Sequence, residues 1–111
     1  MSSSVIVPVQ VDAEEFWSSV LGSAWESWDW WVAVDYSEGS DWDKVGEVTV
    51  TSWDGKTEGE ARITKTLTLQ DLIEGYTKCL ANGSRMNLDD LDACDGDAII
   101  QTAMFGEVVY G

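Results

Sequence analysis

The sequence predicts an α+β domain in which a three- to four-stranded antiparallel sheet packs against two longer helices and one short helix. Three observations lead to this prediction. The chain has 111 residues, 44% of them hydrophobic, which is enough for one core in one domain, residues 1–111. Residues 28–67 contain segments in which apolar and polar residues alternate with a period of two. Later segments repeat apolar residues with the period of a helix.

The first expected elements are a short strand and a helix. Valines alternate along residues 5–11, and Pro8, which cannot donate a hydrogen bond to a sheet, would place this strand at an edge. Asp12 and Glu15 have the spacing of a capping box and predict a helix start, and Gly22 would end that helix.

Three strands of an antiparallel meander are expected next, over residues 28–36, 47–53 and 60–69. The segment "DGKTEG" is typical of a turn between the second and third strands. In the first strand, Trp28 and Trp30 would face the core, whereas Trp31 would point to the opposite side. There Trp31 would be partly exposed, unless helices cover both faces of the sheet and bury it.

The next helix is expected directly after the third strand. Thr68 would cap it, with Asp71 three residues later, and apolar residues between 69 and 80 follow a period of 3.6. Gly83 lies where a helix commonly ends.

A short helical turn and a last helix complete the expected fold. The turn would begin at Asn87 or Asp89. Asp95 would cap the last helix, which Gly106 would end.

Charge is distributed very unevenly along the chain. The formal net charge is −15, from 21 acidic and six basic residues. Residues 1–43 contain nine acids and no base, residues 44–85 six acids and all six bases, and residues 86–111 six acids and no base. Two acidic segments thus flank a neutral middle.

This composition excludes several classes of function. An acidic protein repels nucleic acid and anionic membranes, so we expect neither direct nucleic-acid binding nor membrane association. The chain has no histidine, which excludes catalytic triads that use histidine and zinc sites that need it. We therefore expect a protein that is not an enzyme and carries no cofactor and no metal.

Cysteine content and the N-terminus indicate the compartment. Cys79 and Cys94 lie 15 residues apart, and we expect two reduced, mostly buried thiols, with a disulfide as the alternative. The N-terminal segment lacks a basic leader and a long apolar stretch. These features predict a soluble intracellular protein.

The aspartate run near the C-terminus has some features of a calcium-binding loop. Counted from Asp90, however, Gly96 comes one position late, Cys94 occupies the fifth position and Gln101 the twelfth. We expect these aspartates to cap helices and to form a solvated acidic face instead.

The acidity itself is the main functional signal. Solubility alone needs a net charge of about 2–8 in a small domain. Carboxylates two apart on a strand lie about 7 Å from each other, and those three or four apart on a helix about 5–6 Å. Rows of carboxylates at such spacings can imitate phosphates. The candidate partner-binding carboxylates are Asp35, Glu38, Asp41, Asp43, Asp89, Asp90, Asp92, Asp95 and Asp97, and the candidate apolar anchors are Trp31 and Trp42.

Three stretches of the chain resemble a family of small acidic hypothetical proteins encoded by bacteriophages. They are "GSAWESWDWWVAVDY", "GSDWDKVGEVTV" and "LDACDGDAIIQTAMFGEVVYG", which cover roughly half of the chain. The resemblance implies a viral protein made in the host bacterial cytoplasm, and it carries no catalytic residues. Small acidic phage proteins include DNA mimics of the antirestriction and anti-CRISPR types.

The expected function is therefore that of an acidic phage inhibitor that mimics nucleic acid toward a basic nucleic-acid-binding host protein. One alternative is a phage structural or assembly protein that self-associates through an apolar patch including Trp31 or Phe105. Another is a carbohydrate-binding protein or enzyme that uses tryptophan and carboxylate side chains. The sequence also leaves open whether the protein forms a homodimer.

Overall fold

The computed structural model describes residues 12–22, 30–53, 62–87 and 90–109. These residues form three helices and one three-stranded antiparallel sheet, which confirms the predicted α+β class. In chain order the elements are α1 (Ala13–Leu21), β1 (Trp31–Tyr36), β2 (Glu47–Trp53), β3 (Arg62–Thr68), α2 (Leu69–Ala81) and α3 (Ala93–Phe105). The strand predicted over residues 5–11 lies outside the described residues, as do Trp25 and Trp28.

Two helix starts agree with the prediction. The side chain of Asp12 accepts a hydrogen bond from the backbone N–H of Glu15 at 3.0 Å, which starts α1. Thr68 and Asp71 form a complete capping box at the start of α2, in which each side chain accepts the other residue's backbone N–H. Local sequence determines these starts because the unpaired N–H groups of a first helical turn need nearby acceptors.

The start of α3 corrects the prediction that Asp95 is its cap. The cap is Asp92, whose side chain accepts the backbone N–H of Asp95 at 2.8 Å, and Asp95 returns the bond to the N–H of Asp92 at 3.2 Å. Both aspartates can cap a helix. Because Asp92 is the cap, α3 begins about one turn earlier than predicted. The short helical turn expected from Asn87 or Asp89 would include residues 88 and 89, which lie outside the described residues. The backbone N–H of Asp90 donates to the carbonyl oxygen of Asn87 at 2.9 Å.

Strand β2 is the centre of the sheet and alternates as predicted. Val48, Val50 and Ser52 are fully buried on one face. Thr49 and Thr51 lie on the other face, where their hydroxyls bond threonines of β3. Cross-strand threonine pairs of this kind stabilise the antiparallel pairing of β2 and β3.

Strand β1 contains an irregularity that overturns one prediction. Trp31 pairs with Ser52 and Ala33 pairs with Thr51, so the two residues of β1 are separated by Val32 while their partners are neighbours. Such a bulge changes the alternation of the strand. Trp31 consequently lies opposite a core-facing residue and packs against the core, so the prediction that it points away from the core side of the sheet is wrong.

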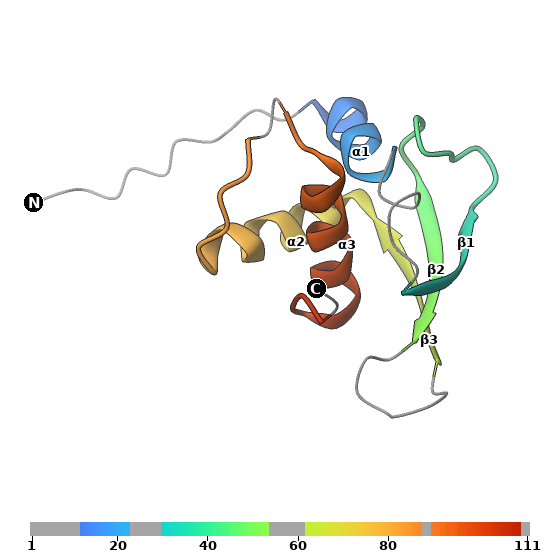
Figure 1. The fold of residues 1–111 in the computed structure, drawn as a ribbon. Helices are drawn as coiled ribbons and strands as arrows, with labels where there is room; N and C mark the ends of the chain where they lie inside the picture. Colours follow the sequence, from blue (N-terminus) through green and yellow to red (C-terminus); the bar gives the residue numbers. More distant parts are fainter. Residues whose placement is uncertain (1–11, 23–29, 54–61, 88–89, 110–111) are drawn as a thin grey trace, which may run out of the picture.

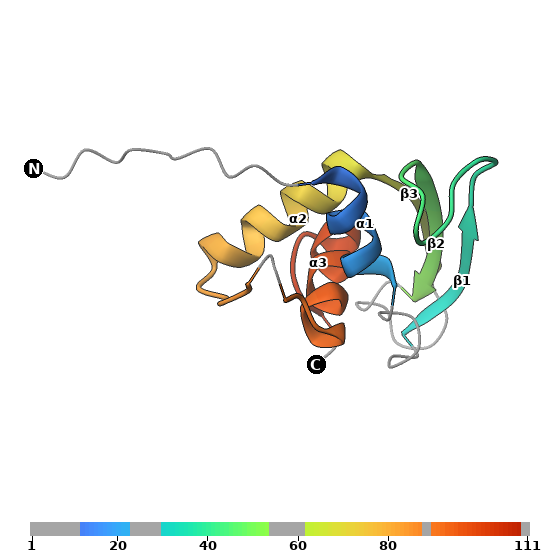
Figure 2. The same ribbon diagram turned by 90° about the horizontal axis from the view of Figure 1, so that it is seen from above.

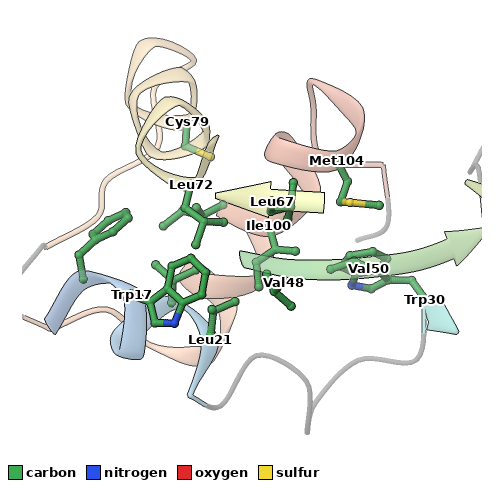
Figure 3. Close-up of a cluster of buried hydrophobic side chains, with 13 residues drawn as sticks. Trp17, Leu21, Trp30, Val48, Val50, Leu67, Leu72, Cys79, Ile100 and Met104 are labelled. Carbon is green, nitrogen blue, oxygen red and sulfur yellow. The ribbon is translucent and has the colours of Figure 1, made fainter. Parts of the chain in front are cut away.

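The three helices lie on one side of the sheet, as Figure 1 shows and as the view from above makes plainest (Figure 2). Their buried side chains meet those of the inner sheet face in a single cluster (Figure 3). Trp17 of α1, Leu72 of α2, Ile100 of α3 and Val48 of β2 are all fully buried there. Trp30 is 5% exposed, which confirms its prediction as a core residue.

Helices α2 and α3 approach each other closely at a glycine. A Cβ atom added to Gly75 of α2 would lie 2.7 Å from the carbonyl oxygen of Ile99 in α3. The last turn of α3 is joined to the sheet by Lys65 of β3, whose ammonium donates a hydrogen bond to the carbonyl oxygen of Ala103 at 2.8 Å. A cation is favourable there because helix C-termini carry partial negative charge.

The two cysteines are not bonded to each other. Cys79 is buried between α2 and α3, where its sulfur lies 3.4 Å from the hydroxyl oxygen of Thr102. Cys94 is exposed, so the expectation of two mostly buried thiols holds for Cys79 alone. None of the described helices is long and apolar enough to span a membrane.

Candidate functional site

The loop between β1 and β2, residues 37–46, is held in shape by its own backbone. The N–H groups of Asp41 and Lys44 each donate to the other residue's carbonyl oxygen, at 3.1 and 3.0 Å. An oxygen of the Asp41 side chain accepts the backbone N–H of Trp42 at 2.8 Å. These bonds close a tight turn, with Trp42 and Asp43 between its two paired residues.

Helix α1 holds this loop in place. The buried indole of Trp17 donates a hydrogen bond from Nε1 to the carbonyl oxygen of Asp41 at 2.7 Å. A Cβ atom added to Gly22, directly after α1, would lie 3.4 Å from Cε3 of the Trp42 indole. The Trp42 ring therefore rests on the end of α1 while 48% of the residue stays exposed.

The acidic residues of the first predicted cluster are all on the surface. Asp35, Glu38, Asp41 and Asp43 are exposed, as a partner-binding role requires. Asp35 lies on the outer side of the sheet, paired with Thr49, whereas the other three lie in the β1–β2 loop.

Helix α1 supplies acidic residues that the sequence prediction omitted from the site. Asp12, Glu14 and Glu15 are exposed at the start of this helix. Their sequence signal was the complete absence of basic residues from positions 1–43. The sequence does not assign them to the site, because the contact between α1 and the β1–β2 loop depends on the fold.

The second predicted cluster is less uniform than the first. Asp89 lies outside the described residues, and Asp90 is exposed. Asp92 and Asp95 also lie at the surface, but their carboxylates form the capping box of α3. These two aspartates therefore have a structural role whether or not they bind a partner.

Asp97 corrects the prediction of an exposed acidic face at this end of the chain. It is 6% exposed and belongs to a buried network. Its carboxylate accepts Trp30 Nε1–H at 2.6 Å and Gln101 Nε2–H at 2.7 Å. The side-chain oxygen of Gln101 in turn accepts the backbone N–H of Val109 at 2.9 Å. Asp97 thus joins the residue before β1, α3 and the segment after α3, and it does not present its charge to a partner.

Burial raises the pKa of the Asp97 carboxyl, and the hydrogen bonds from Trp30 and Gln101 oppose that rise. Both donors are neutral. The carboxylate is thus desolvated without a cationic partner in this network, which is costly unless its hydrogen bonds are complete. Nothing in the sequence distinguishes the buried Asp97 from Asp90, which lies seven residues earlier and is exposed.

The tertiary structure places three acidic segments along one edge of the molecule. The segment before α3, helix α1 and the β1–β2 loop follow one another along the upper edge in Figure 1, and Figure 2 looks down on this edge. We call the exposed acids of these segments the acidic edge: Asp12, Glu14, Glu15, Glu38, Asp41, Asp43, Asp90 and Asp92. Lys44 is the single basic residue in α1, the β1–β2 loop and residues 90–92, whereas Arg85 lies earlier in the connection between α2 and α3.

The two predicted tryptophan anchors have different positions. Trp42 is exposed within the acidic edge, which is compatible with contact to a partner. Trp31 is partly exposed, as expected, but because of the bulge in β1 it packs against the core on the side of Ser52 and not on the outer side of the sheet.

The described residues include no group of three or more cysteine or carboxylate side chains placed to hold a metal ion. No protein-family model matches the chain, and comparisons with curated proteins and with solved structures found no match.

Proposed function

We propose that this protein is a non-enzymatic inhibitor that mimics nucleic acid and occupies the basic groove of a host defence or DNA-processing protein. Bacteriophage origin and action in the host bacterial cytoplasm, as an antirestriction or anti-CRISPR type of protein, are part of this proposal. The observation that supports it is the acidic edge, in which segments far apart in the sequence lie along one edge of the molecule (Figure 1) and carry exposed acids.

The physical basis is the release of counterions. A nucleic-acid-binding protein neutralises phosphates with lysine and arginine side chains, and ions condensed on the nucleic acid are released. A folded polyanion can take the same place, with the partner supplying the basic residues. The acidic edge has eight exposed acids and one base in α1, the β1–β2 loop and residues 90–92, so it would bind such a groove and repel nucleic acid.

The alternative of an assembly protein with an apolar self-association surface has less support. Both residues proposed for that surface, Trp31 and Phe105, pack against the core. Among the described residues, the exposed large apolar side chains are Trp42, Leu80 and Val108, which lie in the β1–β2 loop, in α2 and after α3. Apolar side chains dispersed singly over a surface are ordinary in monomeric proteins.

A pull-down from bacterial lysate tests the proposal. The tagged protein is immobilised, and captured proteins are eluted by rising salt and, separately, by competing DNA. Nucleic-acid-binding proteins should be released by both eluents, because salt screens the ionic contacts and DNA competes for the same groove.

The control is a tagged variant in which Glu38, Asp41 and Asp43 are replaced by the corresponding amides, and it should capture less. A captured protein that resists both salt and DNA would contradict the proposal and indicate an apolar interface. Capture of no protein would also contradict it.

A further inference from the structure

The acidic edge contains one exposed aromatic side chain among the described residues, Trp42. Exposure of the Trp42 ring keeps a large apolar area in water, and contact with a partner would remove that area from water. Tryptophan is also the residue most enriched among those that dominate the binding energy of protein interfaces. Its position within the charged surface links it to the same partner.

The geometry of Trp42 is fixed before any partner binds. The turn that carries it is closed by the paired backbone of Asp41 and Lys44 and is tied to α1 by the Trp17 indole. The Trp42 ring lies against Gly22, where an added Cβ atom would be in van der Waals contact with the ring at 3.4 Å. Ordering of this side chain therefore costs little on binding, which is the property of a preorganised anchor.

The second acidic segment is less suited to contact than the first. The carboxylates of Asp92 and Asp95 accept backbone N–H groups of the α3 start, and Asp97 is buried. Glu14 and Glu15 of α1 are exposed, and α1 is the element on which the Trp42 loop rests. Asp41 and Asp43 adjoin the anchor in the chain, and α1 adds Glu14 and Glu15 at its start, the end away from Gly22.

We propose that Trp42 anchors the contact by entering a flat apolar pocket, within a basic groove, in which the partner otherwise stacks a nucleic-acid base, and that Glu14 and Glu15 at the start of α1 add ionic contacts to the same groove. This inference rests on the proposed function and deepens it, because it identifies the partner as a protein that stacks exposed bases. Aromatic side chains and arginine planes stack on bases in such proteins, and an indole presents a similar flat face.

Release of bound proteins from DNA tests this inference. Bacterial lysate proteins are loaded on one resin that carries single-stranded DNA and on another that carries double-stranded DNA. The full-length protein is then added in rising concentration, and the concentration that releases half of the bound protein is measured. The wild-type protein should release proteins from the single-stranded resin, where bases are accessible to stacking.

Two pairs of matched variants locate the contact. For Trp42→Ala, the concentration that releases half of the bound protein should be about tenfold higher than for the wild type, or more. For Trp42→Phe the increase should be smaller, because phenylalanine keeps a flat ring. Leu80→Ala removes a similarly exposed apolar side chain from α2 and should behave as the wild type. Glu14→Gln with Glu15→Gln should weaken release, whereas Glu74→Gln with Glu107→Gln should have little effect. Each double variant changes the net charge of −15 by the same two units, to −13.

Circular dichroism of each variant keeps loss of folding distinct from loss of contact. If Trp42→Ala matches Leu80→Ala, Trp42 is not the anchor. If the two charge variants are equal, the net charge rather than α1 is recognised. Release by the wild type from double-stranded DNA alone would overturn the base-stacking pocket and leave the proposed function standing. Release from neither resin would contradict the proposed function itself.

Discussion

Two acidic segments of this chain look alike in sequence and differ in structure. Residues 35–43 and 89–97 are both rich in carboxylates and free of bases. In the first segment every acid is exposed. In the second, Asp92 and Asp95 start a helix and Asp97 is buried. The comparison teaches that a run of acidic residues predicts carboxylates free for contact only at the positions where the fold makes no other use of them.

The reason lies in the backbone N–H and C=O groups that each segment leaves without a backbone partner. The first turn of a helix has N–H groups without partners inside the helix, and the aspartates at the start of α3 accept them. The β1–β2 loop pairs backbone groups of Asp41 and Lys44 with each other. The side chains of Glu38 and Asp43 therefore stay available for contact.

Replacement of the buried acid should have the largest effect on stability. Asp97→Ala removes the acceptor of two buried N–H groups, on Trp30 and Gln101, and should lower the free energy of unfolding by about 3 kcal/mol. Urea denaturation measures this change. Asp43→Ala makes the same chemical change in the first segment and is the control. Equal effects of the two substitutions would show that the segments do not differ as described.

Replacement of the α3 cap should have an intermediate effect. Asp92→Ala removes the side chain that accepts the Asp95 N–H, and should cost about 1 kcal/mol of unfolding free energy. Asp92→Asn keeps a capping oxygen and should be close to the wild type in the same denaturation experiment. A loss in Asp92→Asn as large as in Asp92→Ala would indicate that charge rather than capping matters at this position.

The pH dependence of stability should report the burial of Asp97. Because burial raises the pKa of this carboxyl above its ordinary value of 3.8, the folded protein binds a proton more tightly than the unfolded chain does. The contribution of Asp97 to stability is therefore fully present below pH 3.8 and is lost as the pH rises through the folded pKa.

Urea denaturation of the wild type and of Asp97→Asn over a series of pH values measures this contribution. The unfolding free energy of the wild type relative to the variant should decrease as the pH rises through this window. Parallel curves for the two proteins would contradict the assignment. Comparison with the variant removes the effect of the other carboxylates, which titrate in both proteins.

Neutralisation of exposed acids should have the smallest effect. Glu38→Gln with Asp43→Asn should change the free energy of unfolding by no more than about 0.5 kcal/mol, with any change toward higher stability, because self-repulsion decreases. The same pair should weaken capture of a basic partner. A large loss of stability would show that these side chains are structural, as those of the second segment are.

Much of the fold could be predicted because it depends on local signals. The Asp12 and Thr68 caps, the alternation of β2 and the glycine after α3 each follow from a few neighbouring residues. The predictions of the α3 cap and of the side of Trp31 are wrong because two local conformations fit the sequence equally well. Asp92 and Asp95 can both cap a helix, and the bulge at Val32 reverses the side of Trp31 without a sequence signal that distinguishes it from a regular strand.

The sequence by itself determined the fold class, the segregation of charge and the helix starts, because composition and short-range hydrogen bonding are properties of neighbouring residues. Only the tertiary structure decided which carboxylates are exposed. Asp97 meets Trp30, 67 residues earlier, and α1 meets the β1–β2 loop through the bond from Trp17 to Asp41. Such contacts depend on how elements pack, and packing joins residues whose separation along the chain carries no information about their distance in space.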